Sequence, residues 1–196
     1  MRPLILIGAF LLALAAPLAW SADFNEATAI LVAKREMHDR VYGSSVIVVR
    51  PLGQDRHIGF IVNKPTTMTL GKLFPQHLPS QKVVDPVYLG GPMGPEVIFA
   101  MVKGSKSPGG KSLQLTPGLY VAFDSAVVDK IIESKPDEAR FFAGMVLWQP
   151  GELAEEVKRG LWFVLDPQPD LVLQRKTTDG LWEDLVGRAE RKANTI

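Results

Sequence analysis

The sequence contains no cysteine. This absence excludes a disulfide framework, a cysteine-ligated zinc site, a thiol nucleophile and a lipoprotein anchor. The three histidines, His38, His57 and His77, lie about twenty residues apart and form none of the close pairs that are typical of zinc enzymes. We therefore expect neither a metal site nor a cofactor.

The chain also has little net charge. It carries 22 basic and 21 acidic residues, and the segment 1–21 contains one basic residue, Arg2, and no acidic one. Without that segment the counts are 21 and 21, so the formal net charge is zero. Binding to nucleic acid needs a concentrated basic surface that displaces counterions from phosphates. The composition therefore disfavours a nucleic-acid partner.

The N-terminus has the parts of an export signal. Arg2 is a minimal positive region, residues 4–14 are apolar and uncharged, and Ala19 and Ser21 place small residues at the cleavage positions. An apolar run of about 17 residues is also at the lower limit for spanning a membrane, so an uncleaved anchor facing the periplasm is the alternative. We predict a cleaved signal peptide at 1–21 and a periplasmic domain at 22–196, with no stable membrane span after cleavage.

The stretch 141–167 predicts the centre of the fold. Residues 141–148 are almost entirely apolar and too few for a buried helix, which favours a central strand. Pro150 suits the first position of a following helix, and Gly160 suits its left-handed end. A second apolar run at 161–165 predicts the next strand.

The remaining chain predicts mostly short strands. Apolar or β-branched runs occur at 28–33, 44–49, 57–63, 87–89, 97–102, 112–115 and 119–123, and the second and third form a hairpin. Helical spacing predicts a short helix near Leu70, a helix after an N-cap at Asp124 and an amphipathic helix from Leu181; the segment 170–174 is ambiguous. This pattern indicates one α+β domain of mostly antiparallel strands, with helices concentrated toward the C-terminus.

Two patterns resemble catalytic sites only in part. The segment 104–112 ends in Gly-Lys-Ser, but its first glycine is one position from that of a phosphate-binding loop and no long helix can follow, so it predicts a hairpin loop. Glu152, Glu155 and Glu156 are explained most simply as partners of a helix dipole, and an acid–base pair in a cleft is the alternative. No catalytic residue is predicted, although a dispersed hydrolytic site stays open.

Two turns are weak candidates for a binding site, because ligands often bind at strand ends. One precedes Pro65, and the other contains two glycines whose N–H groups can form a small anion-binding nest. The alternative is that both are demanding turns chosen for their backbone angles. With one tryptophan, the candidate binding residues are Asn63, Lys64, Gly90, Gly91, Pro92 and Trp148.

The chain also resembles the YqgE/AlgH family of bacterial proteins. The resemblance is carried by GFIVNKP at 59–65, LGGP at 89–92 and WQPGEL at 148–153, with Trp162, and it covers about residues 27–186. It implies a compact α+β domain of coiled, mainly antiparallel sheets and no established enzymatic activity. The AlgH name implies a role in regulating the transcription of alginate genes. Because most members lack a signal peptide, this chain is identified as a divergent member.

Taken together, these features favour an exported, non-catalytic binding or accessory protein. They do not identify its partner, although an envelope protein is consistent with export. One alternative is a transcription-linked regulator, which requires that the N-terminus is not an export signal. The other is a hydrolase with a dispersed site near Asn63, Lys64 and Gly90.

Overall fold

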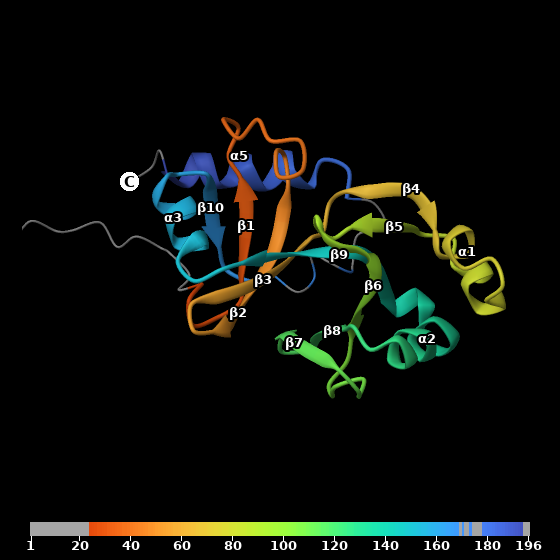
Figure 1. Cartoon of the computed structure of the whole chain (residues 1–196). Coiled ribbons are helices and arrows are strands. Elements are labelled where there is room, and N and C mark those ends of the chain that lie inside the picture. The colour runs from red at the N-terminus through yellow and green to blue at the C-terminus, as the bar shows by residue number, and fades with distance from the viewer. Residues whose placement is uncertain (1–23, 169, 171–172, 174–177, 194–196) are drawn as a thin grey trace, which may run out of the picture.

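The computed structural model describes residues 24–168, 170, 173 and 178–193, so the predicted signal peptide and part of the segment 170–174 lie outside it. Strands and helices alternate irregularly along the chain (Figure 1). The strands are β1 (Ala29–Ala33), β2 (Val46–Gly53), β3 (Arg56–Ile61), β4 (Pro65–Thr69), β5 (Pro86–Leu89), β6 (Met93–Lys103), β7 (Ser112–Thr116), β8 (Leu119–Ala122), β9 (Ala139–Trp148) and β10 (Trp162–Leu165). The helices are α1 (Leu70–Leu73), α2 (Ser125–Ser134), α3 (Glu152–Lys158), α5 (Leu181–Ala193) and the short 3-10 helices η1 (Leu78–Lys82) and η2 (Pro136–Glu138).

The strands form one curled sheet in which β9 is central. The main order is β10-β1-β2-β3-β9-β6-β8-β7, and β5 also pairs with β9 and with β4. Every pairing is antiparallel except that of β5 with β9. This confirms the predicted α+β domain of mostly antiparallel strands, and β9 is the central strand that its apolar sequence predicts.

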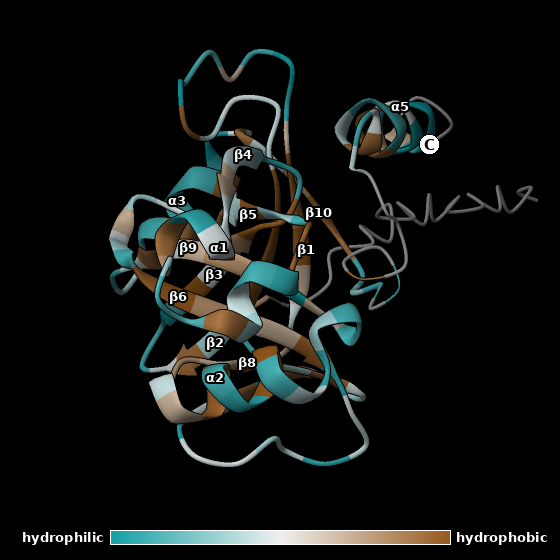
Figure 2. Ribbon diagram, turned by 90° about the vertical axis from the view of Figure 1, so that its right-hand side faces the viewer, coloured by the Kyte–Doolittle hydropathy of each residue, from teal (hydrophilic) through white to brown (hydrophobic). Residues whose placement is uncertain are grey.

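Strand β1 shows how one half of the sheet is covered on both faces. Successive side chains of a strand point to opposite faces. Ile30 and Val32 pack in one buried cluster with Leu185 of α5, whereas Leu31 packs in a second cluster with Leu153 of α3. Figure 2 shows the apolar strands behind the more polar loops and helix surfaces. The two helices therefore sandwich this half of the sheet.

The other half carries α1, η1 and α2. Val128, Ile131 and Ile132 of α2 are buried in a third cluster that also contains Leu70 of α1. Asp124 caps α2 as predicted, because its side chain accepts a hydrogen bond from the N–H of Val127. The helix ends before Pro136, which is also the predicted stop.

One strand was missed and one local prediction was wrong. The segment 65–69 is not among the predicted runs, but it forms β4, which begins at Pro65, lies at the edge of the sheet and pairs with β5. An edge strand tolerates proline, since one side of its backbone needs no ladder partner. Pro150 is not the first residue of α3, because Gly151 is the N-cap and the helix begins at Glu152. Gly160 does adopt a left-handed conformation just after this helix, with φ of 75°.

Among the residues that the structure describes, no helix is both long and apolar enough to cross a membrane.

Candidate functional site

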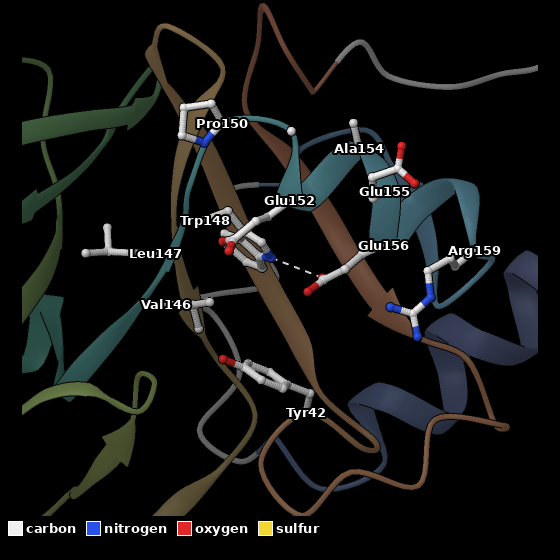
Figure 3. Close-up of a pocket in the computed structure, with 11 residues that line it drawn as sticks. Tyr42, Val146, Leu147, Trp148, Pro150, Glu152, Ala154, Glu155, Glu156 and Arg159 are labelled. Atoms are coloured by element: carbon white, nitrogen blue, oxygen red, sulfur yellow. Dashed lines mark hydrogen bonds between the residues drawn. The ribbon is translucent and has the colours of Figure 1, made fainter.

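A cleft of about 610 Å³ lies beside α3, between this helix and the loop that leads into β2. Its floor comes from the end of β9 and its walls from α3 and Tyr42 (Figure 3). The lining is both aromatic and charged, with three glutamates and one arginine among the described residues. They are Tyr42, Trp148, Pro150, Glu152, Glu155, Glu156 and Arg159, together with Val146, Leu147, Gly151 and Ala154.

Glu156 is held in place by two tryptophans. Its Oε2 accepts hydrogen bonds from the indole N–H of Trp148 at 3.0 Å and of Trp162 at 2.8 Å. Both tryptophans are only 4% exposed, so each indole N–H needs a partner inside the protein. Figure 3 shows the Glu156 side chain extending from α3 toward Trp148. The carboxylate is therefore positioned by the fold, with one oxygen committed to the two indoles.

Tyr42 forms the wall opposite α3. Its ring meets the ring of Trp162 edge-on, with the centroids 6.3 Å apart. Burial raises the pKa of the Tyr42 hydroxyl above its ordinary value, and the negative charge of Glu156 raises it further. The hydroxyl is therefore neutral at physiological pH and faces a region of negative potential.

The first sequence-predicted turn holds the Tyr42 loop in place. Asn63 Oδ1 accepts a hydrogen bond from the N–H of Val46, and its Nδ2 donates to the carbonyl of Ser44. Lys64 Nζ donates to the carbonyl of Val41 at 2.6 Å. Burial lowers the pKa of Lys64, and the nearby negative charge of Asp39 partly opposes that shift. Asn63 and Lys64 are thus supports of the cleft wall and not part of its lining.

The second predicted turn is a place where two stretches of backbone touch. A Cβ on Gly90 would lie 2.2 Å from the carbonyl oxygen of Gly144, and one on Gly91 would lie 2.2 Å from the carbonyl carbon of Met145. The N–H of Gly90 donates to Ala143, so it is not free to bind an anion. These glycines fix the path of β9, which carries Trp148 into the cleft; Pro92 is exposed beside them.

The WQPGEL motif at 148–153 packs against the GFIVNKP motif at 59–65. A Cβ on Gly59 would lie 2.7 Å from the six-membered ring of Trp148, so only glycine leaves room for this indole on β3. Residues of these two motifs therefore lie together beside the cleft. Of the six candidates, Trp148 lines the cleft, and Asn63 and Lys64 hold the loop that forms its wall.

The remaining charged residues differ in their roles. Glu152 Oε2 accepts a hydrogen bond from the N–H of Gln149, which caps the start of α3. Glu155 pairs with Lys158 at 3.5 Å on the exposed side of the helix. Both observations fit the dipole explanation, but Glu156 does not, because it points inward to the two indoles. Arg159 is the C-cap residue of α3 and lines the end of the cleft.

The chemistry of the cleft comes from its carboxylates and its aromatic rings. In the described part of the chain, no three histidine, aspartate or glutamate side chains are grouped to hold a metal ion. His57, the most buried histidine, lies outside the cleft lining, and its Nε2 contacts the carbonyl of Phe24 at 3.1 Å. What the cleft offers is a set of fixed carboxylates beside aromatic rings, and this combination attracts cations.

Sequence reasoning missed Tyr42 and the special place of Glu156. Tyr42 lies in a charged loop without regular spacing, so nothing in the sequence links it to α3. A signal did exist for Glu156: two tryptophans flank a helix with three glutamates, and buried indole N–H groups require acceptors. Which of the three glutamates turns inward depends on the direction of the helix against the sheet.

The fold and the cleft motifs define a protein class, and comparison with known proteins identifies it. Residues 30–194 match the family model described as AlgH-like, so the chain belongs to the AlgH-like (DUF179, UPF0301) family. It is 32% identical over 161 residues to a UPF0301 protein of Ruegeria pomeroyi, covering 79% of this chain and 86% of that one. A UPF0301 protein of Bacteroides fragilis is 26% identical over 169 residues, covering 85% and 84%.

Two solved structures share the fold. The solution structure of the AlgH protein from Pseudomonas aeruginosa aligns with a TM-score of 0.67 at 19% identity, covering 80% of this chain and 85% of that one. The crystal structure of a protein from Corynebacterium diphtheriae aligns with a TM-score of 0.65 at 24% identity, covering 83% and 86%. The molecular function of the family is not known from these relatives.

Proposed function

We propose that this member of the AlgH-like family is an exported, non-catalytic accessory protein that binds a cationic, partly apolar ligand in the cleft beside α3. The observation that carries this proposal is the Glu156 carboxylate, which two buried indoles hold in the α3 wall of an open cleft. A basic side chain of a peptide or envelope protein has the matching chemistry, because its charge meets the glutamates and its aliphatic stem packs on Tyr42.

The charge balance of the lining supports a cationic ligand. Glu152, Glu155 and Glu156 contribute three negative charges to the lining and Arg159 one positive charge, while Lys158 pairs with Glu155 on the exposed side of the helix. Burial is the main cause of the raised pKa of Tyr42, and the negative charges of Glu156, Asp39 and Glu152 raise it further. An anionic ligand would meet repulsion from the carboxylates, since like charges at close range disfavour binding.

A fluorescence titration tests the ligand class. Trp148 and Trp162 flank the carboxylate and report on its surroundings. We expect saturable binding of acetyl-Arg-Phe-Arg-amide and none of acetyl-Glu-Phe-Glu-amide. The double variant Glu152→Gln/Glu155→Gln should bind the basic peptide several-fold more weakly. The matched control, Asp129→Asn/Glu133→Gln, removes two exposed charges from α2 and should bind as the wild type does. Equal binding by both double variants would contradict the proposal.

The export part of the proposal rests on the N-terminal sequence, with Arg2, an apolar run and Ala19 and Ser21 at the cleavage positions. Cell fractionation with intact-mass measurement tests it. We expect periplasmic protein that lacks residues 1–21. Full-length protein in the membrane fraction would replace the cleaved signal with an anchor. Full-length soluble protein in the cytoplasm would overturn export.

A further inference from the structure

A second surface lies away from the cleft, where α1 and η1 project from the sheet at one extremity of the molecule (Figure 1). Nine large hydrophobic side chains are exposed among the described residues, and five of them belong to this short region. We call these five residues the apolar tip: Met68, Leu73, Phe74, Leu78 and Val84. Leu78 is 77% exposed and Val84 is 84% exposed, so both side chains stand almost fully in solvent.

The exposure is not the result of a loosely packed segment. Leu70 and Val83 in the same region are 0% and 8% exposed and belong to the third buried cluster. The Gln81 side chain donates hydrogen bonds to the carbonyls of Gly71, Phe74 and Pro75 and so ties η1 to α1. The region is anchored on one side and presents apolar side chains on the other, which is typical of an interaction surface.

The segment that carries the apolar tip is more basic than acidic. From residue 65 to residue 84 the chain contains Lys72 and Lys82 and no acidic residue. Both lysines are exposed. The next acidic residue, Asp85, lies close enough to Arg140 to affect the pKa of that guanidinium, so its charge is partly balanced there. Exposed apolar side chains with Lys72 and Lys82 among them match a surface with an apolar interior and anionic head groups.

We propose that the apolar tip inserts into the surface of an anionic phospholipid bilayer, with Lys72 and Lys82 against the phosphates. A second copy of the chain fits this surface less well. In a two-fold contact each patch faces its own copy, so two lysines from each copy would be brought together, with Asp85 as the one acidic residue that adjoins the tip in the sequence. The lipid surface supplies both of the missing complements, acyl chains for the five apolar residues and negative charge for the two lysines.

The absence of cysteine makes a site-specific test possible, because one introduced cysteine carries the only label. The full chain is labelled with an environment-sensitive dye at Leu78→Cys or Val84→Cys, and Leu52→Cys serves as the control at an exposed apolar residue of the β2–β3 hairpin. We expect a blue shift at both tip positions with phosphatidylglycerol vesicles, and quenching by nitroxide-labelled lipids. Neither change should occur at position 52.

The electrostatic part is tested with Lys72→Glu/Lys82→Glu on the labelled tip variants. Each lysine near an anionic membrane contributes about a fivefold gain in affinity, so reversing both should weaken binding at least about tenfold. Equal binding to neutral phosphatidylcholine vesicles would overturn the proposal. So would vesicle association without a shift at positions 78 and 84, since the N-terminal apolar segment would then account for it. A shift that grows with protein concentration without lipid would assign the apolar tip to a second copy instead.

Discussion

The cleft and the apolar tip lie at two ends of one domain and differ in which side chains they bury. At the cleft, polar groups are drawn inward: Glu156 joins two buried indoles, and Lys64 reaches the carbonyl of Val41. At the apolar tip, hydrophobic side chains are turned outward although Leu70 beside them is fully buried. Residues at the cleft therefore contribute both to stability and to the proposed binding, whereas tip residues contribute little to stability. Stability and binding measurements on matched variants separate these two contributions.

The largest effect among the cleft variants is expected at the glycines that support the cleft. Gly91→Ala places a methyl group 2.2 Å from the backbone of Met145, so β9 must move. We expect a loss of about 3 kcal/mol in the free energy of unfolding. Urea denaturation measures it. Gly187→Ala is the control, because this position lies in α5 and its nearest neighbour is the flexible end of Arg191 at 3.4 Å. The control should stabilise by up to about 1 kcal/mol.

Removing the shared carboxylate should cost somewhat less. Glu156→Ala leaves two indole N–H groups, both in tryptophans that are 4% exposed, without their acceptor. An unpaired buried donor costs about 1–3 kcal/mol, and water that enters the open cleft offsets part of this, so we expect a net loss of about 2 kcal/mol. Thermal and urea unfolding measure it. Glu155→Ala, one position earlier on the exposed side, should change stability by less than about 0.5 kcal/mol. Equal losses would show that the indole bonds are not what stabilises α3.

Variants of Asn63 test whether this residue stabilises the Tyr42 loop or contacts the ligand. Asn63→Ala removes the acceptor of the Val46 N–H and the donor to Ser44, and we expect a loss of about 1–2 kcal/mol in stability. Asn63→Asp keeps the acceptor and should lose less. A variant that binds the basic peptide poorly while unfolding as the wild type does would place Asn63 in the binding surface.

High pH should weaken the cleft wall through Tyr42. Its pKa is raised in the folded state, so the unfolded chain releases this proton first. The stability that depends on the neutral hydroxyl is present below pH 10 and is lost as the pH rises through the folded value. Difference absorbance titration of the wild type against Tyr42→Phe isolates this group among the three tyrosines. In Glu156→Gln the Tyr42 pKa should fall toward its ordinary value, because one of its causes is removed.

The smallest effect on stability is expected at the apolar tip. Leu78→Asp should leave the free energy of unfolding within about 0.5 kcal/mol of the wild type, because Leu78 is 77% exposed. Leu70→Ala, in the same region but fully buried, should lose about 2–5 kcal/mol. Chemical denaturation of the two variants gives the contrast. If Leu78→Asp were as destabilising as Leu70→Ala, the apolar tip would be part of the core.

Elements with a strong local pattern could be predicted from the sequence. The hairpin of β2 and β3, the capped helix α2 and the amphipathic helix α5 each follow from spacing within a short stretch. Strand β4 could not be predicted, because PTTMT begins with proline and shows no clear alternation; its pairing with β5 decides its structure.

The cleft could be predicted only in part. Trp148 was named as a candidate, and it lines the cleft. Tyr42 was not named, since its position depends on hydrogen bonds from Asn63 and Lys64, about twenty residues further along the chain, to its neighbours. Contacts of this kind depend on how the strands associate, and no local pattern records them.

The position of β9 also has a consequence for how the domain unfolds. The last residues of this strand, 146–148, pair with β3, and its earlier residues pair with β5 and β6. The strand therefore belongs to both halves of the sheet. Neither half can separate without breaking a ladder of the other, which makes the domain a single cooperative unit. The amides of β9 should therefore exchange with solvent only through global opening, and no fragment that lacks this strand should fold alone.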